Sequence, residues 1–122
     1  MSSPNLDFHC FECAAPLADI EVGLINKAVG VLQENGVYAL ILFLKSRGDK
    51  EKEPAQRICE ALCDLWGRRR LALHDMPAGS PYRAALAAAG AFAQDVDQLL
   101  FARDVTERML IYARYHAKAG LA

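Results

Sequence analysis

The chain has 122 residues, of which 53% are hydrophobic and 24% charged, a composition typical of one globular domain. A formal net charge of −1 excludes nucleic-acid binding through an overall basic field, so any such contact must come from a local patch. The N-terminus lacks the basic and apolar regions of a secretory signal, and no apolar run reaches the roughly 20 residues of a membrane helix. We therefore expect a single domain, residues 1–122, in the cytoplasm with reduced thiols.

Charge is unevenly distributed along the chain. Residues 1–35 carry one base and five acids (net −4), residues 36–74 carry eight bases and five acids (net +3), and residues 75–122 carry five of each. An acidic first part and a basic middle part suit head-to-tail contacts between neighbouring copies. Contacts of that kind build filaments when they do not close into rings.

The first clear helical pattern covers residues 17–33. Apolar side chains recur there at close to every 3.6 residues, at Leu17, Ile20, Leu24, Ala28, Val31 and Leu32. Gly36 suits the left-handed residue that follows a helix end. Residues 37–44 are eight consecutive apolar residues, a pattern open to a buried strand or a buried helix. We predict a helix, because Ala, Leu and Phe outnumber β-branched residues and the chain holds no second strong strand pattern.

The middle of the chain is predicted to form one further helix with a loop on either side. Residues 48–53 are polar and are expected to be a loop, while Pro54 suits the first turn of a helix that stops at Gly67. Residues 71–79 are predicted to be a connector. The side chains expected to point inward from the helix are Ile58, Leu62 and Leu65.

The last third of the chain is predicted to form three helices. Ser80 is expected to cap an Ala-rich helix over residues 81–90, which begins with a proline. A short helix over residues 92–101 follows, and Asp104 is expected to cap the last helix, residues 105–119. The elements together predict an all-α, single-domain bundle of five to six helices with short loops.

Two cysteine pairs are the most chemistry-like feature of the sequence. His9, Cys10 and Cys13 form an HCxxC cluster, and Cys59 and Cys63 lie one helical turn apart. A CxxC can hold zinc through two thiolates, with a histidine or a second pair completing the tetrahedron. The alternative is that all four are small core residues in a reducing compartment. Because the second spacing is atypical of zinc sites, we predict packing, with no metal and no cofactor.

Basic residues gather where helices are predicted to end. Lys45 and Arg47 close the apolar run, and residues 68–70 are three consecutive arginines after Gly67. Cations at helix C-termini are favoured by the helix dipole, so a solvated surface is one explanation. Contact with nucleic-acid phosphates is the other.

The last predicted helix carries a basic stripe opposite an apolar one. Arg103, Arg114 and Lys118 fall within about 60° of one another on a helix. Glu107 lies inside this stripe and is expected to pair with Arg103. The opposite arc carries Val105, Met109, Tyr112 and Ala113.

No arrangement of residues in the sequence is typical of an enzyme. The chain lacks a Ser/His/Asp pattern, a phosphate-binding glycine loop and an HExxH motif. Acidic pairs such as Asp95 and Asp97 do not share a helix face. We therefore predict a protein without catalytic residues.

One segment resembles a known family. Residues 35–46, NGVYALILFLKS, resemble the signature helix of the small all-helical subunit of Cmr-type (type III-B) CRISPR effector complexes. Supporting matches lie in both directions along the chain, at Leu6, Asp7, Ala14, Cys63–Trp66, Arg103, Thr106, Glu107, Leu110, Arg114, Ala117 and Lys118. The chain departs from the family pattern at Pro16, at the HCxxC cluster and at Phe101.

The resemblance implies a non-catalytic subunit of an antiviral ribonucleoprotein. Its copies would stack into a minor filament beside other effector subunits and would contact guide and target RNA. The residues that would form this RNA contact are Lys45, Arg47, Arg103, Arg114 and Lys118. Two alternatives remain open, namely the small subunit of a type III-A complex and a zinc-stabilised helical scaffold that binds proteins and not RNA.

Overall fold

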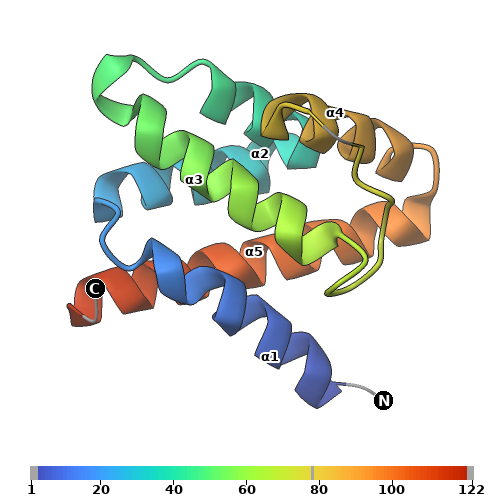
Figure 1. Cartoon of the computed structure of the whole chain (residues 1–122), viewed down its shortest axis with the longest axis horizontal. Helices are drawn as coiled ribbons and strands as arrows, with labels where there is room; N and C mark the ends of the chain where they lie inside the picture. The colour runs from blue at the N-terminus through green and yellow to red at the C-terminus, as the bar shows by residue number, and fades with distance from the viewer. Residues whose placement is uncertain (1–2, 78, 121–122) are drawn as a thin grey trace.

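The computed structural model of the chain describes residues 3–77 and 79–120. The elements, in chain order, are α1 (Ser3–Ala14), a short 3-10 helix η1 (Ala15–Leu17), α2 (Val22–Lys45), α3 (Asp49–Trp66), α4 (Pro81–Phe92) and α5 (Val96–Ala119). No strand occurs among the described residues, so the predicted all-α bundle is confirmed. α5 runs the length of the bundle and packs against α1 and α2, while α3 packs against α2 and α4 (Figure 1).

A break at Gly36 divides α2 into two segments, residues 22–35 and 37–45. Gly36 has φ 94° and ψ −174°, far from helical values. A straight helix of 24 residues would separate its ends by about 36 Å. Instead, Leu24 near its start and Gly48 beyond its end line the same surface depression, so the second segment folds back along the first. Only glycine adopts such a conformation readily, because it lacks a Cβ.

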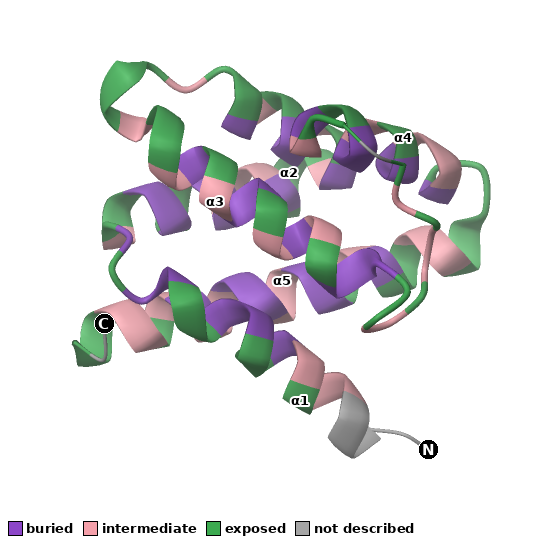
Figure 2. Cartoon of the chain, viewed as in Figure 1, coloured by how far each residue is buried: buried purple, intermediate pink, exposed green. Residues whose placement is uncertain are grey.

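The core is built from the inner faces of α1, α2, α3, α4 and α5, where buried residues concentrate (Figure 2). Trp66 at the end of α3 is fully buried and joins three helices. Its indole N–H donates to the Thr106 hydroxyl of α5 at 3.0 Å, and its ring packs edge-on against Phe92 of α4 with centroids 5.3 Å apart. The residues of α3 predicted to point inward are confirmed as buried, namely Ile58, Leu62 and Leu65.

The start of α3 differs from the prediction. Residues 48–53 are not a loop, because α3 begins at Asp49 with Gly48 as its N-cap residue. Asp49 and Glu51 lie in the first turn, where the helix dipole stabilises carboxylates. Pro54 therefore lies inside the helix and not in its first turn. The predicted helix end at Gly67 is confirmed.

The boundaries of three other helices also shift. The pattern over residues 17–33 begins in η1, and α2 starts only at Val22. The predicted helices 92–101 and 105–119 form one continuous helix, α5. Its N-cap is Asp95, whose carboxylate accepts from the Gln98 N–H at 3.2 Å.

Asp104 is therefore not a cap residue. It lies within α5 and pairs with Arg108 one turn later, at 3.2 Å. Ser80 occupies the predicted N-cap position of α4, although its side chain makes no capping hydrogen bond, and that helix continues to Phe92. The predicted connector 71–79 contains no helix among its described residues, and Ala78 lies outside them.

By length and composition alone α2 is a candidate membrane span, a property that core helices of water-soluble proteins share. The sequence prediction considered only the run over residues 37–44 and missed this. The break at Gly36 leaves two segments that are each shorter than the roughly 20 residues a membrane helix needs. Both segments also bury side chains in the bundle, among them Leu24, Ile25, Leu32, Leu40 and Ile41.

We predict that Gly36→Ala destabilises the protein by about 1–3 kcal/mol, because a Cβ is strained at this backbone conformation. Urea unfolding followed by circular dichroism measures the loss. Gly30→Ala is the matched control in the same helix. Its backbone is helical and a Cβ there meets no atom within 4 Å, so we expect a gain of about 0.5–1 kcal/mol. Equal effects of the two substitutions would contradict the assigned role of Gly36.

Candidate nucleic-acid interface

Lys45 and Arg47 lie where α2 ends, as the sequence predicts. Lys45 is exposed and its Nζ lies 5.3 Å from the centre of the Tyr82 ring. The Arg47 guanidinium lies 4.0 Å above the Phe43 ring, and its Nε donates to the Phe43 carbonyl at 3.2 Å. These contacts fix where the Arg47 guanidinium lies, and a cation over an aromatic face is attracted to it.

The reversal at Gly36 brings Arg47 to the first segment of α2. Glu51 joins two cations from distant parts of the chain, because its carboxylate lies 3.7 Å from Arg47 Nη1 and 3.5 Å from Lys27 Nζ. Lys27 adjoins Asn26 in sequence, and Asn26 contacts α5. The first segment of α2 therefore lies between Arg47 on one side and the basic residues of α5 on the other.

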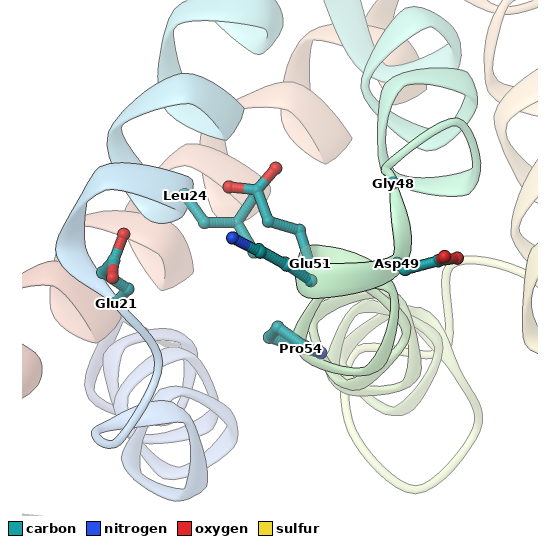
Figure 3. Close-up of a pocket in the computed structure, with 7 residues that line it drawn as sticks. Glu21, Leu24, Gly48, Asp49, Glu51 and Pro54 are labelled. Atoms are coloured by element: carbon teal, nitrogen blue, oxygen red, sulfur yellow. The ribbon is translucent and has the colours of Figure 1, made fainter.

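A depression of about 510 Å³ adjoins this cluster, between the start of α2 and the start of α3 (Figure 3). Its lining carries the three carboxylates of Glu21, Asp49 and Glu51 against the single ammonium of Lys50. Carboxylates repel phosphate, so this depression does not fit a nucleic-acid backbone.

Arg103 and Arg114 lie on the side of α5 that faces α2. Arg103 Nη2 donates to the Gln33 carbonyl at 2.6 Å, and Arg114 Nη1 donates to Asn26 Oδ1 at 3.3 Å. The expected ion pair between Arg103 and Glu107 is wrong. Glu107 instead accepts from Gln33 Nε2 of α2 at 2.6 Å, while Arg103 donates to the backbone carbonyl of the same residue.

The guanidinium groups of Arg103 and Arg114 keep donors for a further acceptor. Each guanidinium has five N–H donors, and the contacts above use one of each. The Arg114 Nε–H is buried and has no partner among the described residues. Lys118 is exposed in the last turn of α5. The predicted stripe of Arg103, Arg114 and Lys118 therefore exists as a row of cations beside α2, with Glu107 within it.

Other arginines are saturated by carboxylates and do not join this row. Arg70 contacts Glu12, Asp64 at 3.1 Å and His9 Nδ1 at 3.3 Å, which ties α1 to the end of α3. Arg57 pairs with Asp19 at 2.7 Å, and the hydrogen bond from Arg57 lowers the pKa of the Asp19 carboxyl. Arg108 bridges Asp7 at 3.1 Å and Asp104. Because carboxylates of the same chain neutralise their charge, these three arginines attract a phosphate less strongly than Arg103 and Arg114 do.

The four cysteines are divided between two places. Cys10 Sγ lies 3.7 Å from the Val105 carbonyl and Cys13 Sγ lies 3.5 Å from Asp64 Oδ2, both at the contacts of α1 with α5 and α3. Cys63 Sγ lies 3.4 Å from the Pro81 carbonyl, at the start of α4. Among the described residues no three His, Cys, Asp or Glu side chains are placed to hold a metal ion.

Comparisons of the chain with protein-family models, with curated proteins and with solved structures found no match. The family resemblance therefore rests on the sequence pattern described above.

Sequence reasoning missed the contribution of α2 to this surface. Lys27, Asn26 and Gln33 contact or flank the predicted cations, yet all three lie in a helix whose polar face carried no recognisable motif. A reversal at Gly36 is the signal that could have placed Lys27 near Arg47, whereas no local signal indicates the contacts of Asn26 and Gln33 with α5.

We predict that the cysteines differ in reactivity toward Ellman's reagent at about pH 8, close to the ordinary pKa of a thiol. Burial raises the pKa of Cys10 to about 11 and that of Cys13 to about 12, so very little reactive thiolate forms. Cys63 is partly exposed and a hydrogen bond from Cys59 lowers its pKa, so it reacts first. Mass spectrometry of the labelled peptides gives the order. In urea all four react at similar rates, and fast labelling of Cys10 and Cys13 in the native protein would contradict the burial argument.

Proposed function

We propose that this protein is the non-catalytic small subunit of a type III-B CRISPR ribonucleoprotein effector, which contacts guide and target RNA through a basic surface on α5 and α2. The resemblance of residues 35–46 to the family signature and the all-helical fold support this assignment. The observation that carries the RNA contact is the geometry of Arg103 and Arg114. Each donates one hydrogen bond to an oxygen of α2 and has further Nη N–H donors for an anion.

The chemistry of this surface fits a phosphate backbone better than base edges. Arginine forks pair with phosphate oxygens, and such contacts position a strand without reading its sequence. Arg103, Arg114 and Lys118 span about 22 Å along α5, at about 1.5 Å per residue. A subunit that supports any target strand needs this kind of contact, since guide pairing supplies the specificity.

Acidic residues within the surface limit its strength. Glu107 lies inside the row of cations, and Glu51 neutralises part of the charge of Lys27 and Arg47. With a net charge of −1, the isolated chain is expected to bind RNA weakly. The proposed function therefore belongs to the assembled complex, where several copies would place their basic surfaces along one strand.

Contacts with neighbouring copies and other subunits are proposed to be mainly apolar. Three of the five acids in residues 1–35 (Asp7, Glu12 and Asp19) pair with arginines of the same chain, which leaves little of the charge asymmetry for head-to-tail attraction. Large apolar side chains are exposed on α2 and at the start of α5, at Tyr38, Leu42, Val96 and Leu100. Tyr38 and Leu42 lie one turn apart on α2, as do Val96 and Leu100 on α5, and neighbouring exposed apolar groups mark surfaces that bind other proteins.

The first test is co-expression of the tagged chain with the products of its neighbouring genes. Recovery of a ribonucleoprotein with RNA of uniform guide length supports the proposal, and the identity of the partners separates a type III-B from a type III-A complex. A monomer that carries neither RNA nor partner refutes the proposal. Stoichiometric zinc in that monomer would favour the scaffold alternative.

We predict that Arg114→Glu combined with Lys118→Glu weakens the binding of target RNA to the assembled complex. The affinity also becomes less dependent on salt. The slope of log affinity against log salt concentration becomes shallower by about 0.7 for each phosphate of a single strand that the variant no longer neutralises. Filter binding at several salt concentrations measures both quantities.

The matched control reverses Arg68 and Arg69, which are exposed and follow α3, whose end contacts α5 at Thr106, more than two helical turns before Arg114. We expect little change in affinity for this variant. Equal reductions in affinity for the two double variants would show that total charge, and not this surface, determines RNA binding.

We also predict that Glu51→Gln strengthens RNA binding and steepens its salt dependence. The substitution removes the carboxylate shared by Lys27 and Arg47 and frees both cations, while the amide keeps the size of the side chain. The same filter-binding series tests this. A weaker complex would indicate that Lys27 and Arg47 need Glu51 to hold their positions.

A further inference from the structure

A second surface feature lies beside the basic row, between α1 and the end of α5. It is a depression of about 390 Å³ lined by Phe11, Tyr112, Tyr115, His116 and Ala119. Its volume falls within the range of about 300–1,000 Å³ found for small-molecule sites. Almost all of the lining atoms are apolar, in contrast to the carboxylate-lined depression at the start of α3.

Aromatic rings form the walls of this depression. Phe11 and Tyr112 meet edge-on with centroids 6.2 Å apart, and Phe8 meets Phe11 in the same way at 5.4 Å. Phe11 is 41% exposed and Tyr115 is 61% exposed. Tyr112 packs against the core, whereas Phe11 and Tyr115 present much of their surface to solvent.

The depression is continuous with the basic row. Arg114 belongs to the row, and its guanidinium lies 5.8 Å from the centre of the Tyr115 ring. Lys118 follows Tyr115 by three residues on the same helix, so the two lie within one turn of each other. Tyr115 therefore stands at the border between cations on the α2 side of α5 and aromatic rings on the α1 side.

We propose that this depression is a stacking site for an unpaired nucleobase of single-stranded RNA, with Tyr115 as its platform. The proposal rests on the proposed function, because it concerns the same strand that the basic row would hold. Single-stranded nucleic acid is bound by aromatic platforms beside cations that follow the phosphates. Arg114 and Lys118 supply the cations, and Phe11, Tyr112 and Tyr115 supply the rings.

The position of the cations favours RNA over a protein partner at this site. An apolar protein segment would gain nothing from Arg114 and Lys118 at the rim and would have to desolvate both charges. A nucleotide uses both halves of the site, since its phosphate is anionic and its base has an apolar face.

The test uses the assembled complex with Tyr115→Ala and a labelled single-stranded target RNA. We expect the dissociation constant to rise by about fivefold to a hundredfold, the range for removal of one base–aromatic stack. The salt slope stays unchanged, because stacking releases no counterions. Tyr115→Phe keeps the ring and retains the wild-type affinity.

Phe101→Ala is the matched control, because Phe101 lies on the same helix, is 40% exposed and does not line the depression. We expect no change in affinity. Photocrosslinking with RNA that contains 4-thiouridine gives a second readout, and the expected crosslinked peptide contains Tyr112 and Tyr115.

The outcomes separate this inference from the proposed function. Unchanged affinity for Tyr115→Ala, with weakened binding by the Arg114 and Lys118 reversal, overturns the stacking site alone. Loss of the Tyr115→Ala subunit from the complex also overturns it and assigns the depression to a protein contact. A wild-type chain that enters no RNA-containing complex refutes the proposed function itself.

Discussion

The reversal of the chain at Gly36 is the constraint on which the rest of the structure depends. A residue at φ 94° inside an otherwise helical stretch turns the second segment of α2 back along the first. This return delivers α3 to the bundle beside the start of α2, and it places Glu51 within reach of both Lys27 and Arg47. Without it, the apolar run over residues 37–44 would extend away from the bundle, with no partner for its buried face.

Two kinds of arginine follow from the way the helices meet. Arg57, Arg70 and Arg108 find carboxylates on α1 or just after it, and they link the N-terminal part of the chain to the rest of the bundle. Exposed pairs of this kind contribute up to about 1 kcal/mol each, so they orient α1 more than they stabilise it. Arg103 and Arg114 meet only neutral groups of α2, which leaves their charge uncompensated by a direct partner among the described residues.

α5 carries two kinds of surface because one of its sides packs against α2 and another packs against α1. The side that meets α2 carries Arg103 and Arg114, and the side that meets α1 carries Tyr112. The Tyr115 ring lies beside the Arg114 guanidinium and lines the same depression as Phe11 and Tyr112. The proposed RNA surface and the proposed stacking site are therefore two parts of one arrangement, set by the position of α5 between α2 and α1.

Sequence alone determined the helical class, because the 3.6-residue apolar period and Gly36 are local signals. It also placed Arg103, Arg114 and Lys118 on one face, since spacing along a helix fixes direction. Polar composition does not distinguish a loop or a cap from a solvent-facing helix turn, so the sequence predictions for residues 48–53 and for Asp104 are wrong. Only the tertiary structure decided which charges are neutralised and which residues adjoin across helices. Those contacts, such as Gln33 with Arg103 and Phe11 with Tyr112, join positions far apart in the chain, and their formation depends on packing that no local pattern encodes.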